Sequence, residues 1–220
     1  MKEKFKDLTI EEKEEKFNGL INYANKIKNK SLRNVCINIL NDFKEELSCR
    51  GAGHDGIEKF KYNRTHQCFD GGLLDHLLNV TKISYNIALT YEKDVDIDLI
   101  LFGAILHDLG KIKIFDKYDK DNEIHSNLNY NYLLVDHVYI GERIVEEYLS
   151  KEDISDKLKY QALHIIATHM DTLDKHMAEA YIVSYADEID AYIENIISYP
   201  RNSINPLFNT YFYESDNSDK

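Results

Sequence analysis

Apolar residues recur at helical spacing along nearly the whole chain, and this pattern limits the possible folds more than any other feature. A clear example is the run formed by Leu32, Val35, Ile39, Leu40, Phe43 and Leu47. Only two residues, Pro200 and Pro206, are prolines, and no stretch alternates apolar and polar residues as a half-buried strand would. A period near 3.6 residues with few helix breakers predicts an all-α fold.

The same pattern predicts where the helices lie. The residues Thr9–Glu12 read "TIEE", a capping box that opens a first helix toward Lys28. A second helix is expected over Leu32–Leu47, and the glycine-containing stretch Cys49–Gly72 is expected to be a loop. Further helices are predicted at Leu73–Tyr91, Ile97–Asp108, Asn131–Leu149, Ser155–His169 and Ala178–Ser198. Gly110, just beyond Asp108, is typical of a helix end.

No glycine- or serine-rich linker divides the chain, so we expect a single domain. Its predicted parts are N-terminal helices over 1–48, a core over 49–206 and a frayed tail over 207–220. The three cysteines lack a CxxC pair, which indicates reduced thiols. No secretory signal or membrane-spanning run is visible, so a cytoplasmic protein is expected.

The net charge of −12 restricts the partners of the protein. Proteins that bind long nucleic acids usually present a basic stripe to the phosphates, and the sequence has only short basic patches. We therefore expect no long duplex and no membrane as a partner. A nucleotide or a short single strand remains compatible with the composition. The sequence leaves the oligomeric state open.

Histidines occupy positions where an amphipathic helix would place apolar residues. His76 shares a stripe with Val80 and Ile83, and His137 shares one with Gly141 and Ile144. His107 and Asp108 each follow a small residue four positions earlier, Gly103 and Ala104, which would let a neighbouring helix approach closely. A single inward histidine is more often a hydrogen-bonded core residue than a metal ligand.

A set of such residues is harder to explain as ordinary core. An unpaired buried carboxylate is costly, whereas imidazoles and carboxylates from separate helices can share a divalent metal ion. Spacing alone does not choose between His164 and His169, or among Asp187, Glu188 and Asp190. From the residues alone, a metal centre and a set of hydrogen-bonded core residues stay open as alternatives.

The order of these residues resembles the HD-domain metal-dependent phosphohydrolases, a superfamily with an all-α fold. The blocks that carry the resemblance are "THQCFDGGLLDHLLNV", "AILHDLGKI", "HVYIGERIV", "ALHIIATH" and "EAYIVSYADEIDA". Within the superfamily, the chain is most similar to the HD domain of YhaM-type 3′–5′ exoribonucleases.

The resemblance implies a role for each matching residue. His76, His107 and Asp187 would hold one metal ion, His137 and His169 a second, and Asp108 would bridge them. Asp108 and Lys111 would be catalytic, and Lys111, His66 and Arg64 would contact the substrate. Imidazole-rich coordination suits Mn²⁺, Fe²⁺, Co²⁺ or Ni²⁺ better than Mg²⁺.

The chain departs from the YhaM pattern near the expected substrate site. The family's "HHG" is His169-Met170-Asp171 here, Asp136 replaces a glycine, and no N-terminal OB-like domain is expected. We therefore expect the chemistry to carry over better than the specificity. The leading prediction is a two-metal phosphodiesterase acting on a nucleotide or, like an exonuclease, on a short single strand. The alternatives are a hydrolase of a cyclic or bridged dinucleotide or nucleoside phosphate, a non-catalytic binding or inhibitor protein, and an interaction protein with a tyrosine-rich surface.

Overall fold

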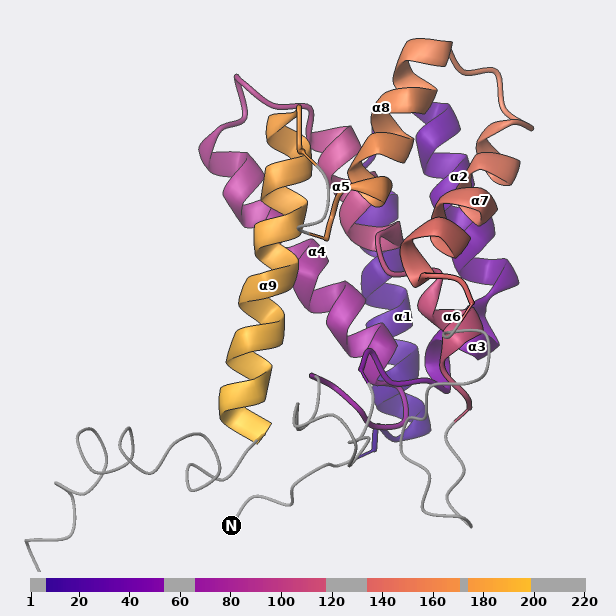
Figure 1. The fold of residues 1–220 in the computed structure, drawn as a ribbon, viewed down its shortest axis with the longest axis vertical. Coiled ribbons are helices and arrows are strands. Elements are labelled where there is room, and N and C mark those ends of the chain that lie inside the picture. The colour runs from indigo at the N-terminus through magenta and orange to yellow at the C-terminus, as the bar shows by residue number, and fades with distance from the viewer. Residues whose placement is uncertain (1–6, 54–65, 118–133, 171–173, 199–220) are drawn as a thin grey trace, which may run out of the picture.

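The computed structural model describes residues 7–53, 66–117, 134–170 and 174–198. These residues form helices and their connections, which confirms the predicted all-α class (Figure 1). The helices are α1 Ile10–Ala24, α2 Lys30–Asp42, α3 Lys44–Ser48, α4 Gly72–Thr90, α5 Ile97–Leu106, α6 Lys111–Ile114, α7 His137–Leu149, α8 Asp156–Ala167 and α9 Ala178–Ser198.

Helix α5 is the centre of the bundle. Every residue from Leu99 to Leu106 is buried, as expected of a helix that is apolar on all sides. Helices α4 and α9 pack on one side of α5, and α2 and α8 on the other (Figure 1). One apolar core runs from Phe17 and Leu20 in α1 to Val183 in α9, so the N-terminal helices share the core of the rest.

The first helix begins as predicted. The Thr9 hydroxyl accepts a hydrogen bond from the Glu12 amide at 3.1 Å, and the Glu12 carboxylate accepts one from the Thr9 amide at 2.8 Å. This reciprocal pair is the capping box, which satisfies amide groups that have no partner within the helix. The same amphipathic pattern places Phe17, Leu20 and Ala24 in the core.

The predicted second helix is interrupted at Phe43, whose backbone has φ −111° and ψ 18°. The Phe43 amide still donates to the Ile39 carbonyl, and its carbonyl accepts from the Leu47 amide, so a break of one residue separates α2 from α3. Leu40 and Leu47 are both buried in the core. Because the apolar spacing continues across the break, the sequence pattern did not reveal it.

Three other helix ends differ from prediction. Helix α5 ends at Leu106 and not at Asp108, because residues 107–110 turn sharply before the short, unpredicted α6. Helix α7 begins at His137 behind the Asp136 cap, and the predicted start at 131 lies outside the described residues. Helix α8 ends at Ala167, which leaves His169 beyond the helix.

Gly110 does not end a helix in the predicted manner. Its φ of −62° is an ordinary right-handed value, so no left-handed cap forms. A side chain there would collide with the neighbouring helix, since an added Cβ would lie 1.9 Å from the His137 carbonyl oxygen. The glycine is therefore required for the close approach of the turn to α7.

All three cysteines are free in the structure. Among the described residues, no helix is long and apolar enough to cross a bilayer. Of the tyrosines considered for an interaction surface, Tyr139 is exposed and Tyr148 is half-buried, with its hydroxyl donating to Asp42 at 2.6 Å. Tyr130 and Tyr132 lie outside the described residues, as does the predicted tail. The division of the chain at 48/49 remains a prediction.

Candidate metal centre

Six buried histidine and aspartate residues from five segments meet in the interior of the bundle. They are His76 of α4, His107 and Asp108 of the turn after α5, His137 at the start of α7, His169 beyond α8, and Asp187 of α9. Each is at most 9% exposed. We call these six residues the buried cluster. Sequence reasoning proposed the same six, and the fold places all of them together.

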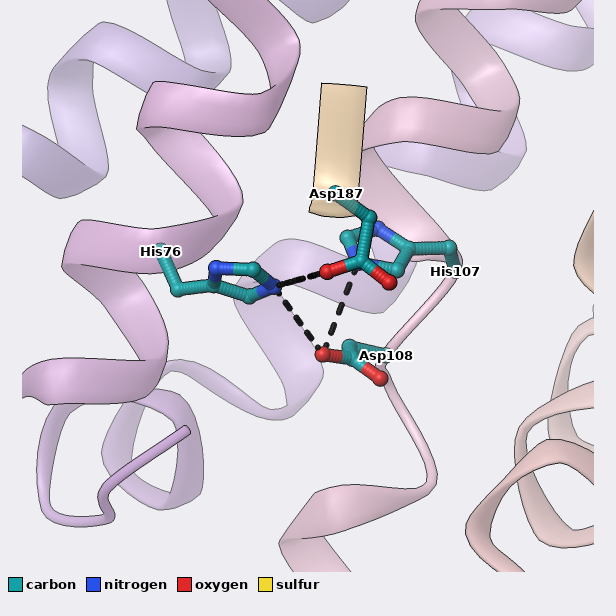
Figure 2. A group of neighbouring side chains, drawn as sticks. All are labelled: His76, His107, Asp108 and Asp187. Atoms are coloured by element: carbon teal, nitrogen blue, oxygen red, sulfur yellow. Dashed lines mark hydrogen bonds and ion pairs between the residues drawn. The ribbon is translucent and has the colours of Figure 1, made fainter. Parts of the chain in front are cut away.

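The first half of the cluster contains His76, His107, Asp108 and Asp187 (Figure 2). His76 Nε2 lies 3.1 Å from Asp187 Oδ1 and 3.2 Å from Asp108 Oδ2. His107 Nε2 lies 3.4 Å from Asp108 Oδ2 and 3.3 Å from His76 Nε2. One atom of each residue therefore faces a common point, as the ligands of a metal ion do.

The second half contains Asp108, His137 and His169. Asp108 Oδ1 lies 3.3 Å from His137 Nε2 and 3.5 Å from His169 Nε2. The two oxygens of Asp108 thus face different groups, Oδ2 the first half and Oδ1 the second. This geometry is the one required of a carboxylate that bridges two ions.

The other ring nitrogen of each histidine contacts an acceptor outside the cluster. His107 Nδ1 donates to the Ala104 carbonyl at 3.0 Å, and His169 Nδ1 to the Ile166 carbonyl at 2.7 Å. His137 Nδ1 is 3.1 Å from the Asp136 carboxylate, and His76 Nδ1 is 2.7 Å from that of Asp190. Because Nδ1 carries a proton in such contacts, Nε2 is the nitrogen that faces the cluster, and it presents a lone pair whenever the ring is neutral.

These lone pairs face carboxylate oxygens that are also hydrogen-bond acceptors. Within the described part of the chain, Asp108 Oδ1, His137 Nε2 and His169 Nε2 make no hydrogen bond, and Asp108 Oδ2 contacts the Lys111 ammonium. Acceptors that face one another in a buried site repel, and a buried polar atom without a partner is costly. A divalent cation between them would convert this arrangement into coordination, so the donor set fits a metal ion.

Two effects determine the pKa values in the cluster: burial, which disfavours the charged form of each group, and neighbouring opposite charges, which favour it. Burial lowers the pKa of His76, but contacts with Asp108, Asp187 and Asp190 outweigh burial and raise it well above its usual value. Burial also opposes ionisation of Asp108, yet Lys111 and the imidazoles hold its pKa well below the usual range. For His169, burial dominates and lowers the pKa. Asp108 is therefore ionised at neutral pH and available as a ligand.

Lys111 and His66, which the family resemblance implied as substrate contacts, lie beside the cluster. The Lys111 ammonium is 2.5 Å from Asp108 Oδ2, although this contact lacks hydrogen-bond geometry. The His66 ring packs on the His76 ring with 4.6 Å between centroids, and burial lowers the pKa of His66 well below its usual value. Arg64, the third expected substrate contact, lies outside the described residues.

The structure also separates the alternatives that spacing left open. His164 is half-buried on α8, stacks on His176 and accepts its backbone amide at 3.2 Å, away from the cluster. Asp187 faces the cluster, whereas Asp190, one turn further along α9, binds the outer nitrogen of His76. Glu188 is only half-buried and belongs to neither ligand group.

Sequence reasoning missed the residues that hold the histidines in place. Asp136 caps α7 through the Val138 amide and contacts His137, and the hydrogen bond to His137 lowers the pKa of Asp136 to about 2. Gln67 donates to Asp190 at 2.8 Å. Asp136 adjoins a predicted ligand in sequence, which could have suggested its role. For Gln67, which is far from α9 in sequence, no local signal existed.

An all-α bundle that buries two groups of histidine and aspartate side chains, with Asp108 facing both, fits the class of helical metal-binding proteins. The family model described as "HD domain" matches residues 73–192, more than half of the chain and the range that contains the whole cluster. The chain belongs to the HD-domain family and is a metal-dependent phosphohydrolase.

A curated relative supports the same chemistry. The dihydroneopterin 2′,3′-cyclic phosphate phosphodiesterase of Methanocaldococcus jannaschii is 30% identical over 189 residues, covering 80% of this chain and 70% of the relative. No solved structure matches the chain significantly. The more specific likeness to YhaM-type exoribonucleases stays a prediction.

Proposed function

We propose that the protein binds two divalent cations and hydrolyses a phosphodiester bond of a small nucleotide-like molecule carrying a cyclic phosphate. The observation that carries the proposal is the position of Asp108, whose two oxygens face two separate groups of ligands. A carboxylate shared in this way suits a pair of cations better than one ion. The site thereby fits the two-metal class of phosphoester hydrolysis.

The ligand types favour particular metals. Four imidazole nitrogens and two aspartates make a nitrogen-rich set, which suits Mn²⁺, Fe²⁺, Co²⁺ or Ni²⁺ better than Mg²⁺. His76, His107 and Asp187 would hold one ion, His137 and His169 the other, and Asp108 both. Such ions lower the pKa of bound water and neutralise charge on phosphate oxygens.

The residues of the chain supply the remaining functions. Lys111 brings an ammonium group to the Asp108 carboxylate, where it would offset negative charge on a phosphate oxygen of the substrate. His66 Nε2 is buried and has no hydrogen-bond partner among the described residues, so it suits contact with a polar group of the substrate. The outer acceptors keep the histidine rings in the orientation that ligation needs.

Two observations favour a small substrate over an oligonucleotide. The relative from Methanocaldococcus jannaschii is named for a cyclic phosphate on a small pterin compound. The net charge of −12 also opposes binding of a polyanionic strand, whose affinity depends on basic contacts to many phosphates. Of the two substrate classes expected from the sequence, the small nucleotide therefore has more support than the short single strand.

A substrate panel tests the proposal. Protein loaded with each candidate metal would be incubated with dihydroneopterin 2′,3′-cyclic phosphate, 2′,3′-cyclic nucleoside monophosphates and short single-stranded oligonucleotides. We expect ring opening of the cyclic phosphates to monoesters. Hydrolysis should be lost in His107→Ala and Asp108→Ala, with the helical circular dichroism retained, while His164→Ala, outside the cluster, should keep it.

The alternatives predict different results. Shortening of oligonucleotides from the 3′ end with intact cyclic phosphates would favour the exonuclease and reject the small-substrate proposal. An oligonucleotide substrate would also lose affinity steeply with added salt, whereas a mononucleotide would lose much less. Binding of these compounds without turnover in every metal would reject the enzymatic function.

A further inference from the structure

Asp190 is a buried carboxylate that lies outside the buried cluster but contacts one of its members. It is 7% exposed and accepts a hydrogen bond from His76 Nδ1 at 2.7 Å. The two residues are 114 positions apart in sequence, on α4 and α9. The acceptors of the other three cluster histidines lie within three residues of them in the chain, at Ala104, Asp136 and Ile166. The orientation of His76 therefore depends on tertiary structure in a way that the others do not.

Gln67 extends this contact to the loop before α4. Its amide nitrogen donates to Asp190 Oδ2 at 2.8 Å, so the oxygen that accepts from His76 also accepts from Gln67. The opposite orientation of the amide would place its oxygen against the carboxylate. Asp190 is thus held from two sides and cannot rotate without losing one of these bonds.

The backbone conformation and the side-chain oxygen of Gln67 are both energetically unfavourable. Its φ of +41° is in the left-handed region, which residues other than glycine rarely adopt. Its side-chain oxygen is buried and has no hydrogen-bond partner among the described residues. The backbone is fixed by a bond from the Ala52 amide to the Gln67 carbonyl at 3.1 Å. An added Cβ at Gly72 would lie 1.9 Å from this carbonyl oxygen, so glycine is needed there.

A strained backbone and an unsatisfied oxygen at one residue call for a functional explanation. We propose that Asp190 and Gln67 are positioning residues that direct His76 Nε2 toward the first metal ion. Gln67 fixes the Asp190 carboxylate, and Asp190 fixes the proton of His76 on Nδ1 and the plane of its ring. The inference rests on the proposed function, since it takes His76 to be a ligand.

The same contacts join the substrate side of the site to the metal side. His66, whose ring packs on His76, adjoins Gln67 in the chain. The loop that carries the expected substrate contact is thereby fixed to the helix that carries Asp187. A change at Gln67 should alter metal binding in the half of the cluster that contains His76, and leave the half with His137 and His169 intact.

The test is calorimetric titration of Mn²⁺ and Co²⁺ into metal-free wild-type and variant protein. Loss of such an outer carboxylate weakens metal binding by about 10- to 100-fold, so Asp190→Ala should lower affinity by that factor at one of the two ions. Gln67→Met removes a neutral donor with little change in size and should lower it by about two- to tenfold. Because Gln67 acts through Asp190, the double variant should bind no more weakly than Asp190→Ala alone.

Controls separate positioning from general damage. Glu194→Gln removes one negative charge from the same helix, a turn beyond Asp190, and should leave both affinities unchanged. Thermal unfolding of each metal-free variant reports on the fold independently. Wild-type affinity in Asp190→Ala, equal losses at both ions, or losses that add in the double variant would each overturn the inference. Failure of the wild-type protein to bind either metal would reject the proposed function itself.

Discussion

At the residue scale, the cluster shows how a protein keeps polar side chains in an apolar interior. His76 and His107 are completely buried, yet each has one nitrogen bonded to an acceptor and the other directed at the cluster. Hydrogen bonding of this kind fixes which nitrogen carries the proton. A hydrogen-bonded core histidine would have needed one partner, whereas these rings direct their second nitrogens at each other, 3.3 Å apart, and at the carboxylate of Asp108. That second nitrogen is what distinguishes a ligand group from ordinary core.

The protonation of these histidines predicts how metal binding depends on pH. Burial lowers the pKa values of His76 and His137, but the neighbouring carboxylates outweigh burial and raise both above 6.5. A protonated imidazole cannot bind a metal ion, so protons compete with the metal at pH values above 6.5. Affinity should therefore rise with pH through neutrality, with release of protons. Calorimetric titrations of metal at several pH values, in buffers of different ionisation enthalpy, measure the affinity and the number of protons released.

The raised pKa values of His76 and His137 have the opposite effect on the stability of the metal-free protein, which falls as pH rises. A raised folded-state pKa gives a contribution to stability that is fully present below the unfolded value, about 6.5, and is lost as pH rises through the raised pKa. Metal should therefore stabilise the protein more at pH 8 than at pH 6. Affinity that does not change over this range would show that these histidines do not ligate.

At the element scale, turns and helix ends place the ligands, while the helix interiors provide the support. His107, Asp108, His137 and His169 all lie at helix ends or just beyond them. Periodicity predicted the longer helices but missed α6 and the break between α2 and α3, and it placed ends of α5, α7 and α8 incorrectly. The turn after α5 depends on close contact between Gly110 and α7, which is a tertiary interaction. Local sequence preferences do not contain that information.

This contact predicts the effect of Gly110→Ala. The new Cβ would overlap the His137 carbonyl oxygen and force the start of α7, with its histidine, away from Asp108. Overpacking of this kind costs about 1–3 kcal/mol, and the ion held by His137 and His169 should bind more weakly than the other. Urea denaturation and metal titration would measure the two effects.

Gly141→Ala is the matched control, since its Cβ would approach Gly110 from the other side at a distance of 3.1 Å from the backbone nitrogen. A small adjustment relieves that contact, and alanine favours the helix. Gly141→Ala should therefore lower stability and metal affinity less than Gly110→Ala does. Equal losses in both variants would mean that the turn tolerates movement and does not position His137.

At the scale of the whole molecule, the buried cluster joins segments that are distant in sequence. Its members come from α4, the turn after α5, α7, the end of α8, and α9, around a central helix that is apolar and buried from Leu99 to Leu106. Metal-free, this centre contains buried carboxylates and imidazoles in close contact, which destabilises the interior. Bound cations would both neutralise the charge and cross-link the five segments.

We therefore expect metal to raise the melting temperature. A ligand at 100 times its dissociation constant stabilises the native state by about 2.7 kcal/mol, which corresponds to roughly 5–10 °C for a domain of this size. Differential scanning fluorimetry with Mn²⁺ and with a chelator measures the shift. Asp108→Ala should abolish it. A shift of equal size in that variant would place the binding elsewhere, for example on the acidic surface.

The sequence by itself determined the all-α class and the core-facing stripes, because the apolar period is a local property, whereas the six members of the cluster were implied by the resemblance to the HD-domain family. Spacing left His164 against His169 and Asp187 against Asp190 open, and the family resemblance chose between them. Only the tertiary structure decided that Asp190 and Gln67 support His76, and that residue 110 must be glycine for α7 to pack closely on the turn. These contacts join residues far apart in the chain, so their geometry depends on how complete helices pack around α5.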